Sequence, residues 1–245
     1  LFQSFGMPLN TIQFEALFRE TSYNVISKCR TTSKKLEALL LGQAGFLSDN
    51  IIDDYAKELQ ELYRSLARKF ELTPHTKGQW NFLRMRPQSF PPVRIVQLSN
   101  LLSNGLTFSK ILDCDEISEV HKLFSINLNN YWRTHYYIDK EGKQSNHNPG
   151  KGFIEKIVIN TIAPLIFLYG KETDNETLQE KAIQFLENTR AEHNNITRMW
   201  TNAGIELNNA METQGVIELY KNYCLKKDCL RCRIGYKILK TACQP

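Results

Sequence analysis

The stretch IIDDYAKELQELYRSLARKF, residues 51–70, sets the fold class of this chain. Its apolar residues recur at three- and four-residue steps and so share one helical face: Ile51, Tyr55, Leu59, Leu62, Leu66 and Phe70. Ser48, Asp49 and Asn50 precede it as candidate caps, and basic residues near its other end complement the helix dipole. We therefore predict an amphipathic helix over this stretch.

The same periodicity continues on both sides of that helix. Gly42 and Gly45 are candidate terminators of the helix before it, and Pro91 suits the start of the helix after it. No segment shows the alternation of apolar and polar residues that indicates a half-buried strand. The sequence predicts an all-α domain of about ten helices, including residues 10–20, 33–40, 93–102, 108–112, 117–124 and 177–186.

One helix is expected at the centre of the domain. Residues Phe153 to Tyr169 are apolar nearly all round, which is typical of a buried helix, and Pro164 should kink it. Asn160 then needs a partner in the core, such as a carbonyl freed near the kink. The polar loop 139–152 precedes this helix. We predict one helical domain over residues 1–245, in which that loop is either a subdomain boundary or a long connection.

Composition narrows the class of protein. The chain has 245 residues, 42% of them hydrophobic, and 13 Phe, 10 Tyr and 3 Trp, which excludes disorder. No apolar run reaches the roughly 18 residues of a membrane span, and no signal peptide follows Leu1. Six unevenly spread cysteines favour a reducing compartment. We expect a cytoplasmic protein without a membrane partner, and we interpret the chain as the C-terminal part of a longer protein.

The net charge of +5 is concentrated in two segments. Residues 64–94 hold seven basic residues against Glu71, and residues 221–240 hold seven against Asp228. These windows carry +12, so the rest of the chain carries −7. Two basic segments on an acidic body are typical of a protein that binds nucleic acid, DNA or RNA.

Basic and aromatic residues interleave in the first window. Guanidinium groups there would contact phosphates, and Trp80 or Phe90 would stack on a base. The alternative is a connector anchored in the core, with its rings buried and its arginines solvated. The predicted nucleic-acid-binding residues are Trp80, Arg84, Arg86, Arg94, Arg231, Arg233 and Lys237.

A cysteine cluster lies at the C-terminal end. Cys224, Cys229 and Cys232 have the spacing C-x4-C-x2-C, and Cys243 follows after ten residues. Four thiolates there could bind Zn²⁺ or an iron–sulfur cluster. The spacing matches neither a zinc ribbon nor a ferredoxin, so packing as buried small side chains and a redox switch stay as alternatives.

No catalytic residue is predicted in this chain. His135 lies in the aromatic run YWRTHYY, residues 131–137, where spacing marks no nucleophile or carboxylate partner. Residues 149–152, PGKG, lack the glycine and hydroxyl positions of a phosphate-binding loop. We therefore do not expect this segment to be an enzyme by itself.

Five blocks of sequence resemble one family. They are LLLGQAGF at 39–46, FLRMRP at 82–87, YWRTHY at 131–136, INT at 159–161, and the cysteine-containing segment 223–235. The chain resembles domain-of-unknown-function family 2851, an uncharacterised family of Bacteroidota. The resemblance implies a helical C-terminal part of longer proteins, whose N-terminal half weakly resembles a restriction-endonuclease-like nuclease. It implies no established activity and supplies no catalytic residues.

Together these patterns lead to one functional expectation and one alternative. The chain is expected to be a helical accessory domain that binds nucleic acid through its basic segments, in support of a nuclease-like N-terminal half. The alternative is a structural or protein-interaction domain that packs on that half without contacting nucleic acid.

Overall fold

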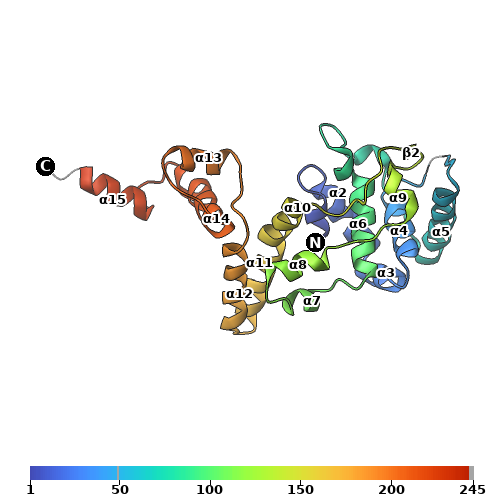
Figure 1. The fold of residues 1–245 in the computed structure, drawn as a ribbon, viewed down its shortest axis with the longest axis horizontal. Coiled ribbons are helices and arrows are strands. Elements are labelled where there is room, and N and C mark those ends of the chain that lie inside the picture. Colours follow the sequence, from blue (N-terminus) through green and yellow to red (C-terminus); the bar gives the residue numbers. More distant parts are fainter. Residues whose placement is uncertain (49, 243–245) are drawn as a thin grey trace. The chain divides into compact units, whose positions relative to one another are not determined.

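A computed structural model describes residues 1–48 and 50–242 and divides the chain into two compact units, Leu1–Ile157 and Val158–Pro245 (Figure 1). Helices dominate both units. Within the described residues the named strands are β1 (His135–Tyr137) and β2 (Lys140–Glu141), an antiparallel pair in the first unit. The prediction of an all-α protein is confirmed.

The first unit holds more helices than periodicity revealed, because helices of four to seven residues are too short to show a pattern. Its helical elements are α1 (Phe2–Phe5), α2 (Thr11–Thr21), α3 (Tyr23–Cys29), α4 (Ser33–Gln43), α5 (Asp54–Phe70), η1 (Lys77–Gln79), η2 (Pro87–Ser89), α6 (Pro91–Ser103), α7 (Phe108–Leu112), α8 (Ile117–Leu123), α9 (Asn130–Thr134) and α10 (Lys151–Ile157).

Helix α6 lies at the centre of the first unit. Every residue from Pro91 to Leu101 is buried, and α4 packs against both α6 and α5. Two prolines open α6, where the missing N–H groups would have had no helical partner. The most deeply buried helix is therefore α6, rather than the segment from Phe153 to Tyr169.

Helix α5 begins at Asp54, three residues later than periodicity suggested. Asp53, rather than Ser48 or Asn50, stands at the N-cap position, and Asp49 lies outside the described residues. The carboxylate of Asp139, on the turn between β1 and β2, instead accepts hydrogen bonds from the backbone N–H groups of Ile52 and Asp53, both at 2.9 Å. A side chain distant in sequence thus satisfies donors at the start of α5.

Gly42 does not end α4. It lies inside the helix, where a Cβ atom would come within 2.0 Å of the Tyr63 ring on α5. The absence of a side chain at Gly42 lets that ring lie directly on the α4 backbone. Gly45, with φ of +83°, is the residue that turns the chain after α4.

The segment from Phe153 to Tyr169 is buried only in its first part. A π-helical turn, η3 (Val158–Ile162), separates α10 from α11 (Ala163–Glu172) just before Pro164, whose missing N–H interrupts the α-helical ladder. Beyond that turn α11 packs one side on α12 (Glu176–Glu187). Its other side is open, so the prediction of burial all round is wrong for α11: the exposed residues are Leu165, Phe167, Leu168 and Tyr169.

The continuous helical run Lys151–Glu172 is also long and apolar enough to cross a membrane by length and composition. Of its most apolar window, 44% is buried inside the protein. Core helices of soluble proteins pass the same test, so this property does not indicate a membrane span.

The second unit also contains α13 (Asn195–Asn202), α14 (Ala210–Leu219), η4 (Tyr220–Cys224) and α15 (Arg233–Ala242). The division between the units falls after Ile157, inside the helical run, and not in the loop 139–152. That residues 1–245 fold as a single domain stays a prediction.

Candidate functional site

Aromatic rings gather around Tyr137 at the end of β1: Phe46 is buried, whereas Phe82, Phe90 and Tyr137 itself are half-buried. The Phe82 ring lies 5.6 Å from Tyr137 between centroids, and the Phe46 ring lies 5.8 Å from Tyr137. Phe90 contacts Phe82 edge-on at 5.2 Å. These contacts fix the loop between η1 and η2 to the β-hairpin, although the two segments are far apart in the sequence.

Two lysine side chains lie over the Tyr137 ring of this aromatic cluster. The ammonium groups of Lys77 and Lys140 lie 5.0 Å and 5.4 Å from the centroid of the Tyr137 ring, within cation–π range. Arg84 and Arg86 are exposed on the loop that carries Phe82, and Arg84 has a positive φ of 60°. In residues 1–48 and 50–242 neither arginine forms an ion pair. We call Lys77, Phe82, Arg84, Arg86, Tyr137 and Lys140 the Tyr137 surface.

The structure removes Trp80 from the predicted stacking residues. Its side chain is buried between Phe14 and Phe46, with ring centroids 5.4 Å away on each side. Its indole N–H donates a 2.8 Å hydrogen bond to the Ala44 carbonyl oxygen. The prediction for Trp80 is wrong because the ring anchors the loop in the core, which was the alternative for this stretch.

Arg94 is also not a surface cation. It is 9% exposed on α6, with its guanidinium carbon 3.5 Å from the centroid of the Phe153 ring. It donates hydrogen bonds to Gln97 Oε1 at 2.9 Å and Ser89 Oγ at 3.4 Å. Desolvation lowers the pKa of Arg94 to about 10. Burial in the core makes the predicted phosphate contact of Arg94 wrong.

The three basic residues predicted in the second window lie in the second unit. Arg231 Nε donates a 2.8 Å hydrogen bond to Asp228 Oδ2, and Arg231 Nη2 forms an ion pair with the same oxygen at 2.5 Å. The hydrogen bond and the positive charge of Arg231 lower the pKa of Asp228. Arg233 and Lys237 are exposed on α15. Their contact with phosphate stays a prediction, as it does for Arg84 and Arg86.

The described cysteines do not form a metal site by themselves. Cys224 and Cys229 are exposed, whereas Cys232 is buried and its Sγ accepts a 3.5 Å hydrogen bond from the Gly235 N–H. Among the residues that the structure describes, no three His, Cys, Asp or Glu side chains are arranged to hold a metal ion. Cys243 lies outside the described residues, so the four-cysteine site for zinc or an iron–sulfur cluster stays a prediction.

A buried carboxyl group forms a second polar cluster that the sequence did not reveal. Glu37 on α4 is 3% exposed, and its Oε1 accepts hydrogen bonds from Trp132 Nε1 at 2.5 Å and from the Tyr55 hydroxyl at 3.0 Å. The side-chain amide of Asn129 donates in turn to that hydroxyl. Burial raises the pKa of Glu37 to about 7, against the lowering effect of its two donors.

This cluster opens to solvent through a cleft of about 410 Å³. The cleft is lined by Ser33, Lys34, Glu37, Tyr55, Asn100, Asn127, Leu128 and Asn129. A carboxyl group with a pKa near neutrality can both donate and accept a proton at pH 7. The cleft thus contains one element of acid–base chemistry, the carboxyl group of Glu37.

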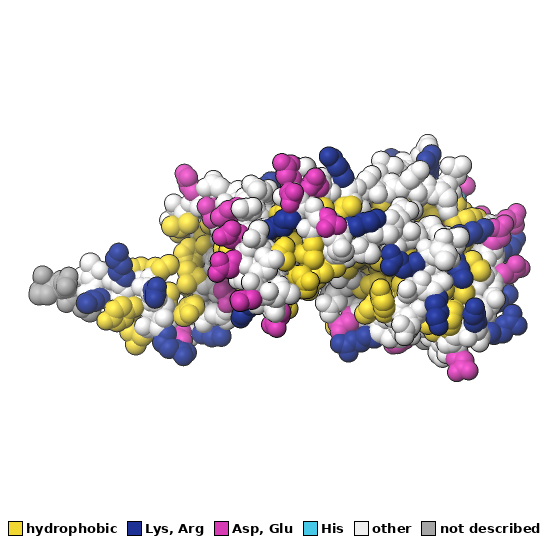
Figure 2. Space-filling model, turned by 90° about the horizontal axis from the view of Figure 1, so that it is seen from below, with side chains coloured by type: hydrophobic (Ala, Val, Ile, Leu, Met, Phe, Trp, Pro, Cys, Tyr) yellow, Lys and Arg dark blue, Asp and Glu magenta, His cyan; other side chains and the backbone are white. Residues whose placement is uncertain are grey.

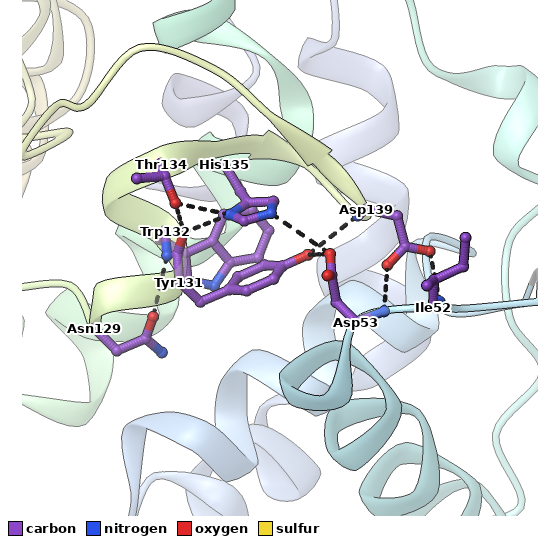
Figure 3. Close-up of polar contacts among 8 residues, drawn as sticks. All are labelled: Ile52, Asp53, Asn129, Tyr131, Trp132, Thr134, His135 and Asp139. Carbon is purple, nitrogen blue, oxygen red and sulfur yellow. Dashed lines mark hydrogen bonds and ion pairs between the residues drawn. The ribbon is translucent and has the colours of Figure 1, made fainter.

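His135 stands in a neighbouring network, shown in Figure 3. Its ring stacks on Tyr131 at 3.9 Å, its Nδ1 lies 2.8 Å from the Tyr131 carbonyl oxygen, and its Nε2 lies 3.5 Å from Asp53 Oδ2. Because a carbonyl oxygen only accepts, Nδ1 carries the proton. The Tyr131 hydroxyl also donates to Asp53. These contacts connect the β-hairpin to the start of α5. They are the contacts expected of a hydrogen-bonded structural histidine.

A family model described as a protein of unknown function (DUF2851) matches residues 1–195. The chain belongs to this family. Neither a curated protein nor a solved structure matches the chain. The family match spans the whole first unit, including the Tyr137 surface and Glu37, and ends before residues 223–235. The relation of longer members to a nuclease fold stays a prediction.

Proposed function

We propose that the first unit binds nucleic acid through the Tyr137 surface, as an accessory to the nuclease-like region that the resemblance implies for longer family members. The observation that carries the proposal is the position of two ammonium groups over one half-buried tyrosine ring. Nearby, Arg84 and Arg86 are exposed without ion pairs in the described chain.

Each part of this surface matches a part of a nucleic-acid strand. Aromatic rings stack on bases, and this stacking contributes about 1–3 kcal/mol per base without strong sequence preference. Exposed cations neutralise phosphates and supply most of the non-specific affinity. A base stacked on Tyr137 would displace one lysine toward the adjacent phosphate. Because an unpaired base is needed for stacking, the surface is suited to a single strand.

The test is the affinity of the purified chain for a short labelled single strand and for a duplex. We expect tighter binding of the single strand. The double substitution Arg84→Glu and Arg86→Glu should weaken binding at least tenfold, since two phosphate contacts become repulsive. The matched control is Arg64→Glu with Arg68→Glu, which changes the same charge at two exposed positions on α5. If both double variants lose the same affinity for the single strand, the loss reflects the change in net charge alone, which would contradict the proposal.

Binding of another protein is a second candidate function, and a separate observation on α11 favours it. The open side of α11 exposes Leu165, Phe167 and Leu168, which is typical of a surface that another protein covers. This favours the protein-interaction alternative for the second unit, with the N-terminal half of a longer protein as the partner. Mixing the chain with that half and measuring a stable complex, lost on Phe167→Ser, tests this function separately from nucleic-acid binding.

A further inference from the structure

Helix α15 is amphipathic, but no part of the chain that the structure describes covers its apolar side. Ile234 and Ile238 are 53% and 62% exposed, and Leu239 is exposed as well. Ile234 and Ile238 are one helical turn apart in the ten-residue helix Arg233–Ala242, and Leu239 follows Ile238 directly. An apolar helix face of this kind is normally buried against a partner.

The opposite side of α15 is basic. Arg233, Lys237 and Lys240 are at positions i, i+4 and i+7, so they share one face of the helix. All three are exposed, and the segment from Arg231 to Lys240 contains no acidic residue. Figure 2 shows hydrophobic and basic side chains together on the surface of α15.

We propose that α15 binds the surface of a membrane that contains anionic lipids. The basic side chains would contact the lipid headgroups, while Ile234, Ile238 and Leu239 would enter the boundary between headgroups and acyl chains. The combination of the two faces selects this partner. Nucleic acid complements the basic side but offers no counterpart to an exposed aliphatic side. A neutral apolar groove on a protein would leave the three cations without partners.

This inference concerns binding in the plane of the membrane surface, which differs from spanning it, and it replaces the expectation from the sequence of a protein without a membrane partner. It is independent of the Tyr137 surface, because α15 belongs to the second unit and lies outside the family match. Loss of nucleic-acid binding and loss of lipid binding are therefore expected from different substitutions.

The experiment measures binding of the full chain to vesicles of phosphatidylcholine, with and without phosphatidylserine. We expect binding only with phosphatidylserine, and weakening by salt. Lys237→Glu should reduce vesicle binding more than tenfold. Each cation near an anionic surface raises the affinity about fivefold, and this substitution both removes a cation and adds an anion. Ile238→Ser should also reduce it, because it removes apolar area from the interface.

Two matched variants serve as controls. Lys171→Glu makes the same charge change on the exposed end of α11, and Ile12→Ser makes the same polar change at another exposed isoleucine. Both should bind vesicles like the unmodified chain. In addition, Tyr236→Trp places a fluorophore on α15, and its emission should shift to shorter wavelength on phosphatidylserine vesicles as the indole leaves water.

Three results would overturn the inference. The first is absence of binding to phosphatidylserine vesicles together with an unshifted emission from Tyr236→Trp. The second is a dimer in solution that Ile238→Ser dissociates, which would assign the apolar side to a second copy of the chain. The third is DNA binding that Lys237→Glu abolishes and Ile238→Ser leaves intact.

Discussion

Trp132 Nε1 donates a 2.5 Å hydrogen bond to Oε1 of Glu37, and the two residues are 95 positions apart. The bond joins α9 to α4 beside the cleft that Glu37 lines. A carboxyl group this deeply buried is stable only when it is hydrogen-bonded or neutral; Glu37 accepts two hydrogen bonds, and burial raises its pKa to about 7. The pH dependence of stability and the effect of Trp132→Phe both follow from this arrangement.

The stability of the protein should fall as pH rises from about 4.5 to about 7. Glu37 has a folded-state pKa of about 7, above its ordinary value of 4.5, so the folded state holds a proton that the unfolded state releases in this interval. The contribution is fully present below pH 4.5 and is lost as pH passes 7. Its size is about 3 kcal/mol, to order of magnitude. Glu37→Gln, which stays neutral, should remove this part of the pH dependence in urea unfolding. An unchanged pH profile in Glu37→Gln would contradict the assignment.

Trp132→Phe should destabilise the protein by roughly 1–3 kcal/mol, because a buried acceptor loses its shortest hydrogen bond. It should also raise the pKa of Glu37 further, since that bond favours the charged form. The control is Trp200→Phe: the Trp200 indole N–H is buried and has no partner in the described chain, so its removal should cost little. Equal losses in the two variants would show that ring packing, rather than the bond to Glu37, is responsible.

Gly42→Ala should destabilise the protein by several kcal/mol, since the new Cβ would lie 2.0 Å from the Tyr63 ring. Gly215→Ala is the matched substitution inside helix α14, where nothing lies within 4 Å of the new atom. It should stabilise by up to about 1 kcal/mol, because alanine favours the helix. Thermal unfolding of both variants measures the difference, and a neutral Gly42→Ala would refute the close contact.

Asp139→Ala should cost about 1 kcal/mol, because two backbone donors at the start of α5 lose their acceptor. Desolvation opposes the charged form of Asp139, but the N–H groups of Asp53 and Ile52 outweigh it and lower the pKa of the carboxyl. A lowered pKa stabilises the fold at neutral pH, and this stabilisation is lost as the solution becomes acidic. Asp113→Ala, at an exposed aspartate after α7, should change stability by only a few tenths of a kcal/mol.

The helices of this chain could be predicted from periodicity because their apolar faces are regular. Residues 108–112 form α7 as expected, and α2 begins and ends within one residue of its predicted bounds. The β-hairpin was missed because β1 and β2 span only three and two residues, too few for alternation to appear. The short helix α9 was missed for the same reason.

The candidate sites could not be predicted in full from the sequence, because periodicity does not show which side chains the fold buries or brings together. Tertiary packing decides which basic and aromatic residues of the first window are exposed. Trp80 and Arg94 are buried, whereas Arg84 and Arg86 are exposed. Tyr137 and Phe82 are far apart in the sequence, and their rings come into contact in the folded chain. Glu37 left one signal, a single acid among the leucines of LEALLL at residues 36–41. Its partners Tyr55 and Trp132 could not be inferred from that pattern.

The most direct test of the central claim is the salt dependence of single-strand binding by the unmodified chain and by Lys140→Glu. If the Tyr137 surface binds nucleic acid, the logarithm of the association constant falls linearly with the logarithm of salt concentration, and Lys140→Glu makes the slope shallower by about one phosphate contact. The same slope in Lys140→Glu, or no binding even at low salt, would contradict the claim.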